Sequence, residues 1–136
     1  MLLDEVRCRR AVAEAFPGLE AHSARYFAAG WDYELWEVNE EWLVRFPLRE
    51  ECAAPLLVEA RLLLALQEEL SVAVPKPDYV SEGCASFPLP FIAYRKLRGV
   101  PLVEAALDER ARLSIAEQLG RFLTELPAYL SSARPR

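Results

Sequence analysis

The chain has 136 residues, of which 53% are hydrophobic, and this is enough for one domain with a substantial apolar core. Its net charge of -5 argues against a nucleic-acid binder or an anionic-membrane binder, because both partners attract cationic surfaces. The amino terminus lacks the apolar stretch of a signal peptide, and no uncharged apolar run is long enough to span a bilayer. We therefore expect a cytoplasmic protein with no membrane or nucleic-acid partner.

The first half of the chain predicts a helix followed by three strands. Apolar residues recur at helical spacing from about residue 2 to residue 16, where the sequence FPGLE ends the pattern. A short apolar segment at 24–29 leads to Gly30, and alternating residues on both sides of the polar turn VNEEW indicate two more strands. These last two strands are expected to pair as a hairpin.

The second half predicts a long helix, two strands and a final helix. The segment 51–70 has a wide apolar face and is too long for a strand. Two prolines in VPKPDYV favour extended backbone, and an apolar strand is expected from about 91 to 97. Leucines and alanines at three- and four-residue steps indicate an amphipathic helix over 108–130, interrupted or bent near Pro127.

This order of elements predicts an α+β domain with an antiparallel sheet of about five strands, a long helix after the third strand, and helices at both ends. We expect a single domain over 1–130 and a frayed tail over 131–136. The three cysteines are widely spaced with no CxxC pair, so they are interpreted as reduced structural thiols, and no metal site is expected.

Five segments in order resemble one known family. They are GWDYELWEVNEEWLVRFP, VEARLLL, VPKP, PFIAYRKLRGVPL and RARLSIAEQLGRFLTEL, between residues 30 and 126. Together they resemble the N-terminal, nucleotide-binding lobe of the aminoglycoside phosphotransferase and choline kinase family, and most closely the 2''-aminoglycoside phosphotransferases. The resemblance covers nearly the whole chain and implies a protein-kinase-like N-terminal lobe.

The resemblance implies a site for ATP or GTP with magnesium. The turn between the first two strands would fold over the phosphates, and a basic residue of the third strand would contact them while it pairs with a helix glutamate. The strand that ends in FIAYRKL would lead to a hinge whose backbone bonds the purine edge. The implied nucleotide-binding residues are Gly30, Trp31, Asp32, Tyr33, Arg45, Glu59, Tyr94, Arg95, Lys96 and Leu97.

The strand arginine can also be interpreted without the resemblance. Strand alternation places Leu43 and Arg45 on one face and Trp42, Val44 and Phe46 on the other. A guanidinium beside an apolar neighbour needs a partner, because an unpaired buried charge is costly. A helix glutamate would provide one, so a purely structural ion pair is the alternative to a nucleotide contact. In the same way, the three tryptophans near the hairpin are expected to pack across strands rather than to stack on a base.

The catalytic residues of the family are not recognisable in this sequence. Family members have an HGD-like segment, a following asparagine and a downstream aspartate in the C-terminal lobe. Here the single histidine is followed by serine, and the single asparagine is in the hairpin turn. We therefore assign no catalytic residue and expect the isolated chain to be inactive, as a lobe truncated before the catalytic loop. The alternatives are a non-catalytic binding module and a half-enzyme completed by a separate chain.

The helix predicted over 108–130 would expose apolar surface in an isolated lobe. Such surface favours association with another chain. We therefore expect self-association or domain swapping through this helix.

Overall fold

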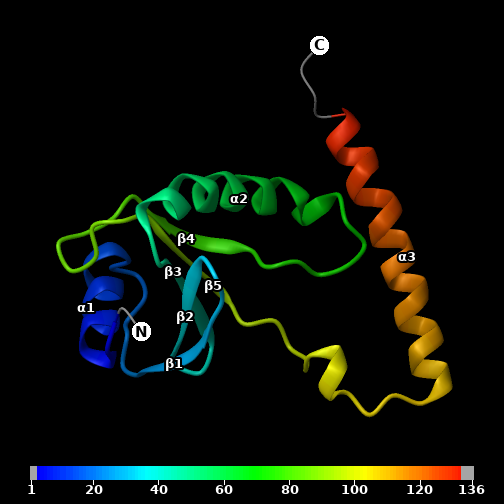
Figure 1. The fold of residues 1–136 in the computed structure, drawn as a ribbon, viewed down its shortest axis with the longest axis horizontal. Coiled ribbons are helices and arrows are strands. Elements are labelled where there is room, and N and C mark those ends of the chain that lie inside the picture. The colour runs from blue at the N-terminus through cyan, green and yellow to red at the C-terminus, as the bar shows by residue number, and fades with distance from the viewer. Residues whose placement is uncertain (1–2, 133–136) are drawn as a thin grey trace. The chain divides into compact units, whose positions relative to one another are not determined.

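The structure is a computed structural model that describes residues 3–132 of the chain. It divides into two compact units, residues 1–64 with 75–96 and residues 65–74 with 97–136. Figure 1 shows the course of the chain through its helices and strands. Each unit is considered by itself below. The expectation of a single domain over 1–130 stays a prediction.

Five antiparallel strands form the sheet of the first unit. They are β1 (Ala24–Ala29), β2 (Tyr33–Val38), β3 (Trp42–Pro47), β4 (Pro77–Ser81) and β5 (Phe91–Arg95), in the spatial order β1-β2-β3-β5-β4. The predicted α+β class, with about five antiparallel strands, is therefore confirmed. The arrangement places β3 at the centre of the sheet, between the hairpin partner β2 and the later strand β5.

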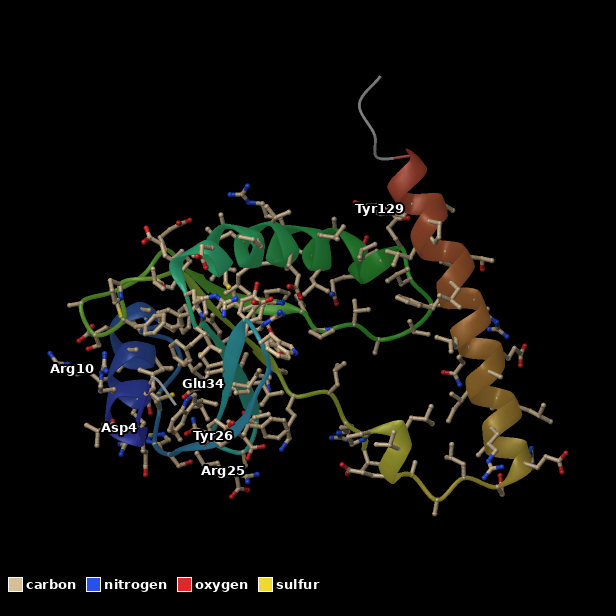
Figure 2. All side chains as sticks on the ribbon, in the orientation of Figure 1. Asp4, Arg10, Arg25, Tyr26, Glu34 and Tyr129 are labelled. Carbon is tan, nitrogen blue, oxygen red and sulfur yellow. The ribbon has the colours of Figure 1, made fainter. Side chains whose placement is uncertain are left out.

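One face of the sheet packs against α1 (Glu5–Ala15). Figure 2 labels Asp4 at the start of this helix, where its carboxylate accepts a bond of 2.8 Å from the amide of Arg7 and caps the first turn. The cluster on this face is rich in aromatic rings, and Phe46 and Phe91 stack with their centroids 4.8 Å apart. This face therefore forms the larger part of the core.

The other face of the sheet packs against α2 (Ala53–Ala65), which follows the short 3-10 helix η1 (Glu50–Cys52). Leu56 and Ala60 on the helix contact Leu43 and Ile92 on the strands. Because successive strand residues point to opposite faces, Leu43 and Arg45 share the α2 side of β3. The short 3-10 helix η2 (Leu66–Glu68) follows α2. The region predicted as one helix over 51–70 therefore consists of three consecutive helices, η1, α2 and η2.

The hairpin between β2 and β3 is closed by residues with left-handed backbone. Asn39 and Glu40 have φ values of 54° and 59°, the region that turn residues such as asparagine tolerate. The Asn39 side chain accepts bonds from the amides of His22 and Ser23 and donates to the carbonyl of Glu20. The polar turn therefore also fixes the segment that leads into β1.

The second unit contains η3 (Leu102–Glu104) and the long helix α3 (Glu109–Ser132). Glu125 of α3 accepts bonds from the amide and hydroxyl of Ser71, at 2.8 and 3.0 Å. The helix continues through Pro127, so it is not interrupted there, and the predicted bend at this residue stays a prediction. Proline removes one backbone donor, and near the end of a long helix this loss interrupts only one bond of the last turns. Of the expected frayed tail over 131–136, the first two residues belong to α3. Residues 133–136 lie outside the described residues.

No helix between residues 3 and 132 combines the length and the apolar character that crossing a bilayer requires.

Candidate functional site

A pocket of about 440 Å³ opens on the α2 side of the sheet, beside the turn between β1 and β2. Small-molecule sites in proteins have volumes of this order. Its lining residues come from the turn and from β2, β3 and β5, and they are Gly30, Trp31, Asp32, Tyr33, Leu35, Arg45 and Tyr94. Six of the residues implied by the resemblance therefore meet at one place.

Arg45 provides the positive charge of this pocket. Its Nη1 donates to Oε1 of Glu59 on α2 at 2.6 Å, and the two side chains are 20% and 39% exposed. The guanidinium also lies over the ring of Tyr33, 3.8 Å from the ring centroid. Since a guanidinium has five N–H donors, the bond to Glu59 leaves other donors for an anion.

The aromatic walls of the pocket are neutral phenols. Burial raises the pKa of Tyr94, and it also raises the pKa of Tyr33 against the opposing effect of the Arg45 charge. The Tyr33 hydroxyl donates to the carbonyl of Cys52 at 3.3 Å, which ties the start of β2 to the end of η1. Both rings therefore stay uncharged at neutral pH, and the Tyr33 ring covers one side of the guanidinium.

The glycine turn is closed by backbone bonds. The Gly30 amide donates to the carbonyl of Tyr33 at 2.9 Å, and the amide of Leu48 donates to the carbonyl of Asp32 at 2.8 Å. A Cβ atom at Gly30 would meet no other atom within 4 Å. The space above the turn is thus open to a ligand, and the turn does not need glycine for its own packing.

Trp31 lies at the tip of this turn and is 92% exposed. The other two tryptophans are buried, Trp36 against Tyr26 and Trp42 against Tyr79. The expected cross-strand packing therefore applies to Trp36 and Trp42. For Trp31 it is wrong, because this residue belongs to the turn and has no strand neighbour to cover it.

Besides Glu59, three of the implied residues are not among those that line the pocket. Arg95 pairs with Glu41 and lies over the ring of Trp42, on the opposite face of the sheet. Lys96 donates through Nζ to the buried carboxylate of Glu37 at 2.5 Å. Leu97 belongs to the second unit and is 44% exposed.

Arg49 is a residue that the sequence did not single out. It follows β3 and donates through Nη2 to Oδ1 of Asp32 at 2.5 Å and through Nη1 to the carbonyl of Trp31 at 2.9 Å. The only signal in the sequence is the second arginine in RFPLRE, four residues after Arg45. Nothing in that spacing shows that it returns to the glycine turn.

Comparison with protein families gives one match, to the phosphotransferase enzyme family, over residues 23–136. The chain belongs to this phosphotransferase family. The match includes every residue that lines the pocket, and the predicted membership is confirmed. Comparison with curated protein sequences gives no match.

Solved structures of phosphotransferases of this type have the same fold. The GDP and kanamycin complex of APH(2'')-IIIa is 28% identical with a TM-score of 0.80, over 96% of this chain and 43% of that one. A GDP complex of wild-type aminoglycoside 2'-phosphotransferase-IIIa is 27% identical with a TM-score of 0.81, over 98% and 43%. The streptomycin and ATP complex of APH(2'')-IIa is 19% identical with a TM-score of 0.56, over 81% and 36%, and shows the fold alone. This chain therefore spans less than half the length of these proteins.

Proposed function

We propose that this chain is the nucleotide-binding part of a small-molecule kinase of the phosphotransferase family. In this proposal it binds ATP or GTP in the pocket between the Gly30–Tyr33 turn and Arg45. The observation that supports it best is that Arg45, which lines that pocket, pairs with Glu59 of α2 at 2.6 Å. A partly buried cation oriented by a carboxylate is suited to hold phosphate oxygens.

The relatives support the choice of ligand. Two of the similar structures are complexes with GDP. The pocket offers the same kinds of group that a nucleotide needs, namely a guanidinium, aromatic walls and an open glycine turn. The purine edge would bond to backbone groups at the end of β5, near Tyr94. The side chains of Arg95 and Lys96 would then act in the sheet and not on the ligand.

In the complete enzyme the bound nucleotide would supply the phosphoryl group for a hydroxyl acceptor. The chain's own residues would hold and orient the phosphates and keep water from the aromatic side of the pocket. Magnesium would accompany the nucleotide. Between residues 3 and 132, no group of three or more His, Cys, Asp or Glu side chains could hold a metal ion, so we assign no magnesium ligand in this region.

Calorimetric titration with ATP and with GTP, each with magnesium, tests the proposal. The wild-type chain is expected to bind, and Arg45→Ala to bind at least about tenfold more weakly, because charge-assisted hydrogen bonds contribute about 1.5–3 kcal/mol. Arg121→Ala is the matched control, since Arg121 is an exposed arginine that pairs with Glu117 on α3.

Two results would contradict the proposal. The first is a folded wild-type chain that binds neither nucleotide up to about millimolar concentration, the weak end of specific affinity. The second is an Arg45→Ala variant that binds as tightly as the Arg121→Ala control. Circular dichroism of each variant shows whether the fold is retained.

A further inference from the structure

The end of β3 holds the glycine turn through one guanidinium. Arg49 donates to the Trp31 carbonyl at 2.9 Å, to the Asp32 carboxylate at 2.5 Å and to the Glu51 carboxylate at 3.2 Å. Next to it, the Leu48 amide donates to the Asp32 carbonyl. Two consecutive residues of the turn are therefore fixed to the segment that follows β3.

Asp32 is an acid among the pocket residues, where the proposed ligand is an anion. A carboxylate close to phosphate oxygens weakens their binding by like-charge repulsion. The bond from Arg49 neutralises this charge on one oxygen, and the Cys52 thiol approaches the same oxygen at 3.6 Å. Burial raises the pKa of Cys52, so its thiol adds no second negative charge.

This ion pair is poorly suited to stabilise the fold. Both side chains of the Arg49–Asp32 pair are 51% exposed. Exposed pairs contribute little to the free energy of unfolding because water screens them and side-chain entropy opposes them. Its geometry, however, is specific, since one planar group joins a backbone carbonyl and a carboxylate of the same turn. The arrangement is better suited to order the turn than to stabilise the domain.

We propose that Arg49 is a positioning residue for the nucleotide. It holds the Gly30–Asp32 turn in its closed form and masks the Asp32 charge, so that the turn can face phosphate with a single glycine. This inference rests on the proposed function for its ligand. Its structural half, the ordering of the turn, can be measured without any nucleotide.

Three variants separate the two effects: Arg49→Ala, Asp32→Asn and the double variant. Arg121→Ala is again the matched control for loss of an exposed, paired arginine. Titration with ATP and GTP measures the affinity of each variant. Exchange of the Leu48 amide hydrogen, followed by NMR without nucleotide, measures closure of the turn, because this amide donates to the Asp32 carbonyl.

We expect Arg49→Ala to bind nucleotide about tenfold more weakly, the effect of one lost charge-assisted contact. The double variant should recover part of this loss, because Asp32→Asn removes the repulsive charge but not the disorder of the turn. Leu48 exchange should be faster in Arg49→Ala and in the double variant than in the control, while the unfolding midpoint stays close to that of the wild type.

Equal affinity and equal Leu48 exchange in Arg49→Ala and Arg121→Ala would overturn the inference and leave Arg49 as an ordinary surface ion pair. If the wild-type chain binds no nucleotide, the proposed function fails. In that case unchanged Leu48 exchange in Arg49→Ala also overturns the ordering of the turn, whereas faster exchange upholds it. The two failures are therefore distinguishable.

Discussion

The buried carboxylate of Glu37, on β2, forms ion pairs with two basic side chains. Glu37 is 1% exposed and accepts bonds from Arg25 at 2.6 Å and from Lys96 at 2.5 Å. Figure 2 labels Arg25 on the edge strand β1. The bond from Lys96, followed by that from Arg25, lowers the pKa of Glu37. Because a buried carboxylate needs its partners, Glu37 holds both Lys96 and Arg25 by charge-assisted bonds.

The bonds that the Glu14 carboxylate accepts predict an acid-sensitive contact between α1 and the loop before β5. It accepts bonds from the amide and hydroxyl of Ser86 at 2.9 and 2.7 Å, and these bonds lower its pKa from 4.5 to about 2. A carboxyl group with a lowered pKa in the folded state contributes stability above its unfolded pKa of 4.5. That contribution is lost as the pH falls from 4.5 towards 2.

Glu14→Gln should therefore be less stable than the wild type at pH 7, and the difference should shrink below pH 4.5. Urea unfolding at pH 7, 5 and 3 measures it. The control is Glu5→Gln on the same helix, where Glu5 makes only a 4.0 Å pair with Arg9. A difference between Glu14→Gln and wild type that stays constant down to pH 3 would contradict the assignment.

At the scale of elements, the glycine positions separate folding from ligand binding. Gly83, in the loop between β4 and β5, has a φ of 115°, and a Cβ atom there would lie 2.5 Å from the Pro88 carbonyl oxygen. At Gly30 a Cβ atom would meet no atom within 4 Å, and the backbone does not have a positive φ. Gly83 is therefore required by the fold, whereas Gly30 is required only if an anion approaches the turn.

Gly83→Ala is expected to lower the free energy of unfolding by at least about 2 kcal/mol, because a strained backbone and a steric clash combine. Gly30→Ala should leave stability within about 0.5 kcal/mol of wild type but weaken nucleotide binding. Urea unfolding and nucleotide titration of both variants provide the measurements. A Gly30→Ala protein as unstable as Gly83→Ala would show that the turn glycine is structural.

The elements also show what the sequence could and could not predict. Period-two alternation predicted that Leu43 and Arg45 share one face of β3, and helical spacing predicted a helix that contains Glu59. The resemblance implied that Arg45 and Glu59 pair, and the structure shows that the shared face is the one that packs against α2. The same alternation on β5 sends the Arg95 side chain to the face opposite Tyr94, so only a backbone contact of Arg95 with a purine, as the resemblance implied, stays a prediction. Arg49 was missed because its contacts with the turn join residues 17 and 18 positions apart, which local spacing does not show.

At the scale of the whole molecule, the chain matches the solved relatives over almost its entire length but spans only 43% of the two at 27–28% identity. Within its own unit, α3 presents Leu113, Leu119 and Leu123, which are 65%, 52% and 61% exposed. Leu119 and Leu123 are four residues apart and therefore lie on the same side of this helix of 24 residues. An apolar stripe of this kind favours association when two copies can cover it.

The last prediction is therefore that this chain self-associates through α3. Sedimentation velocity at increasing concentration should show a rising apparent mass, because two stripes remove apolar surface from water when they pack together. The double variant Leu119→Glu/Leu123→Glu should remain monomeric with unchanged helical circular dichroism, since both positions are solvent-exposed. The matched control is Glu117→Gln/Arg121→Gln, which removes an ion pair from the same helix and should still associate.

A wild-type chain that stays monomeric at the highest concentration would contradict the role of α3. Equal association of wild type and the double glutamate variant would assign the contact to another surface.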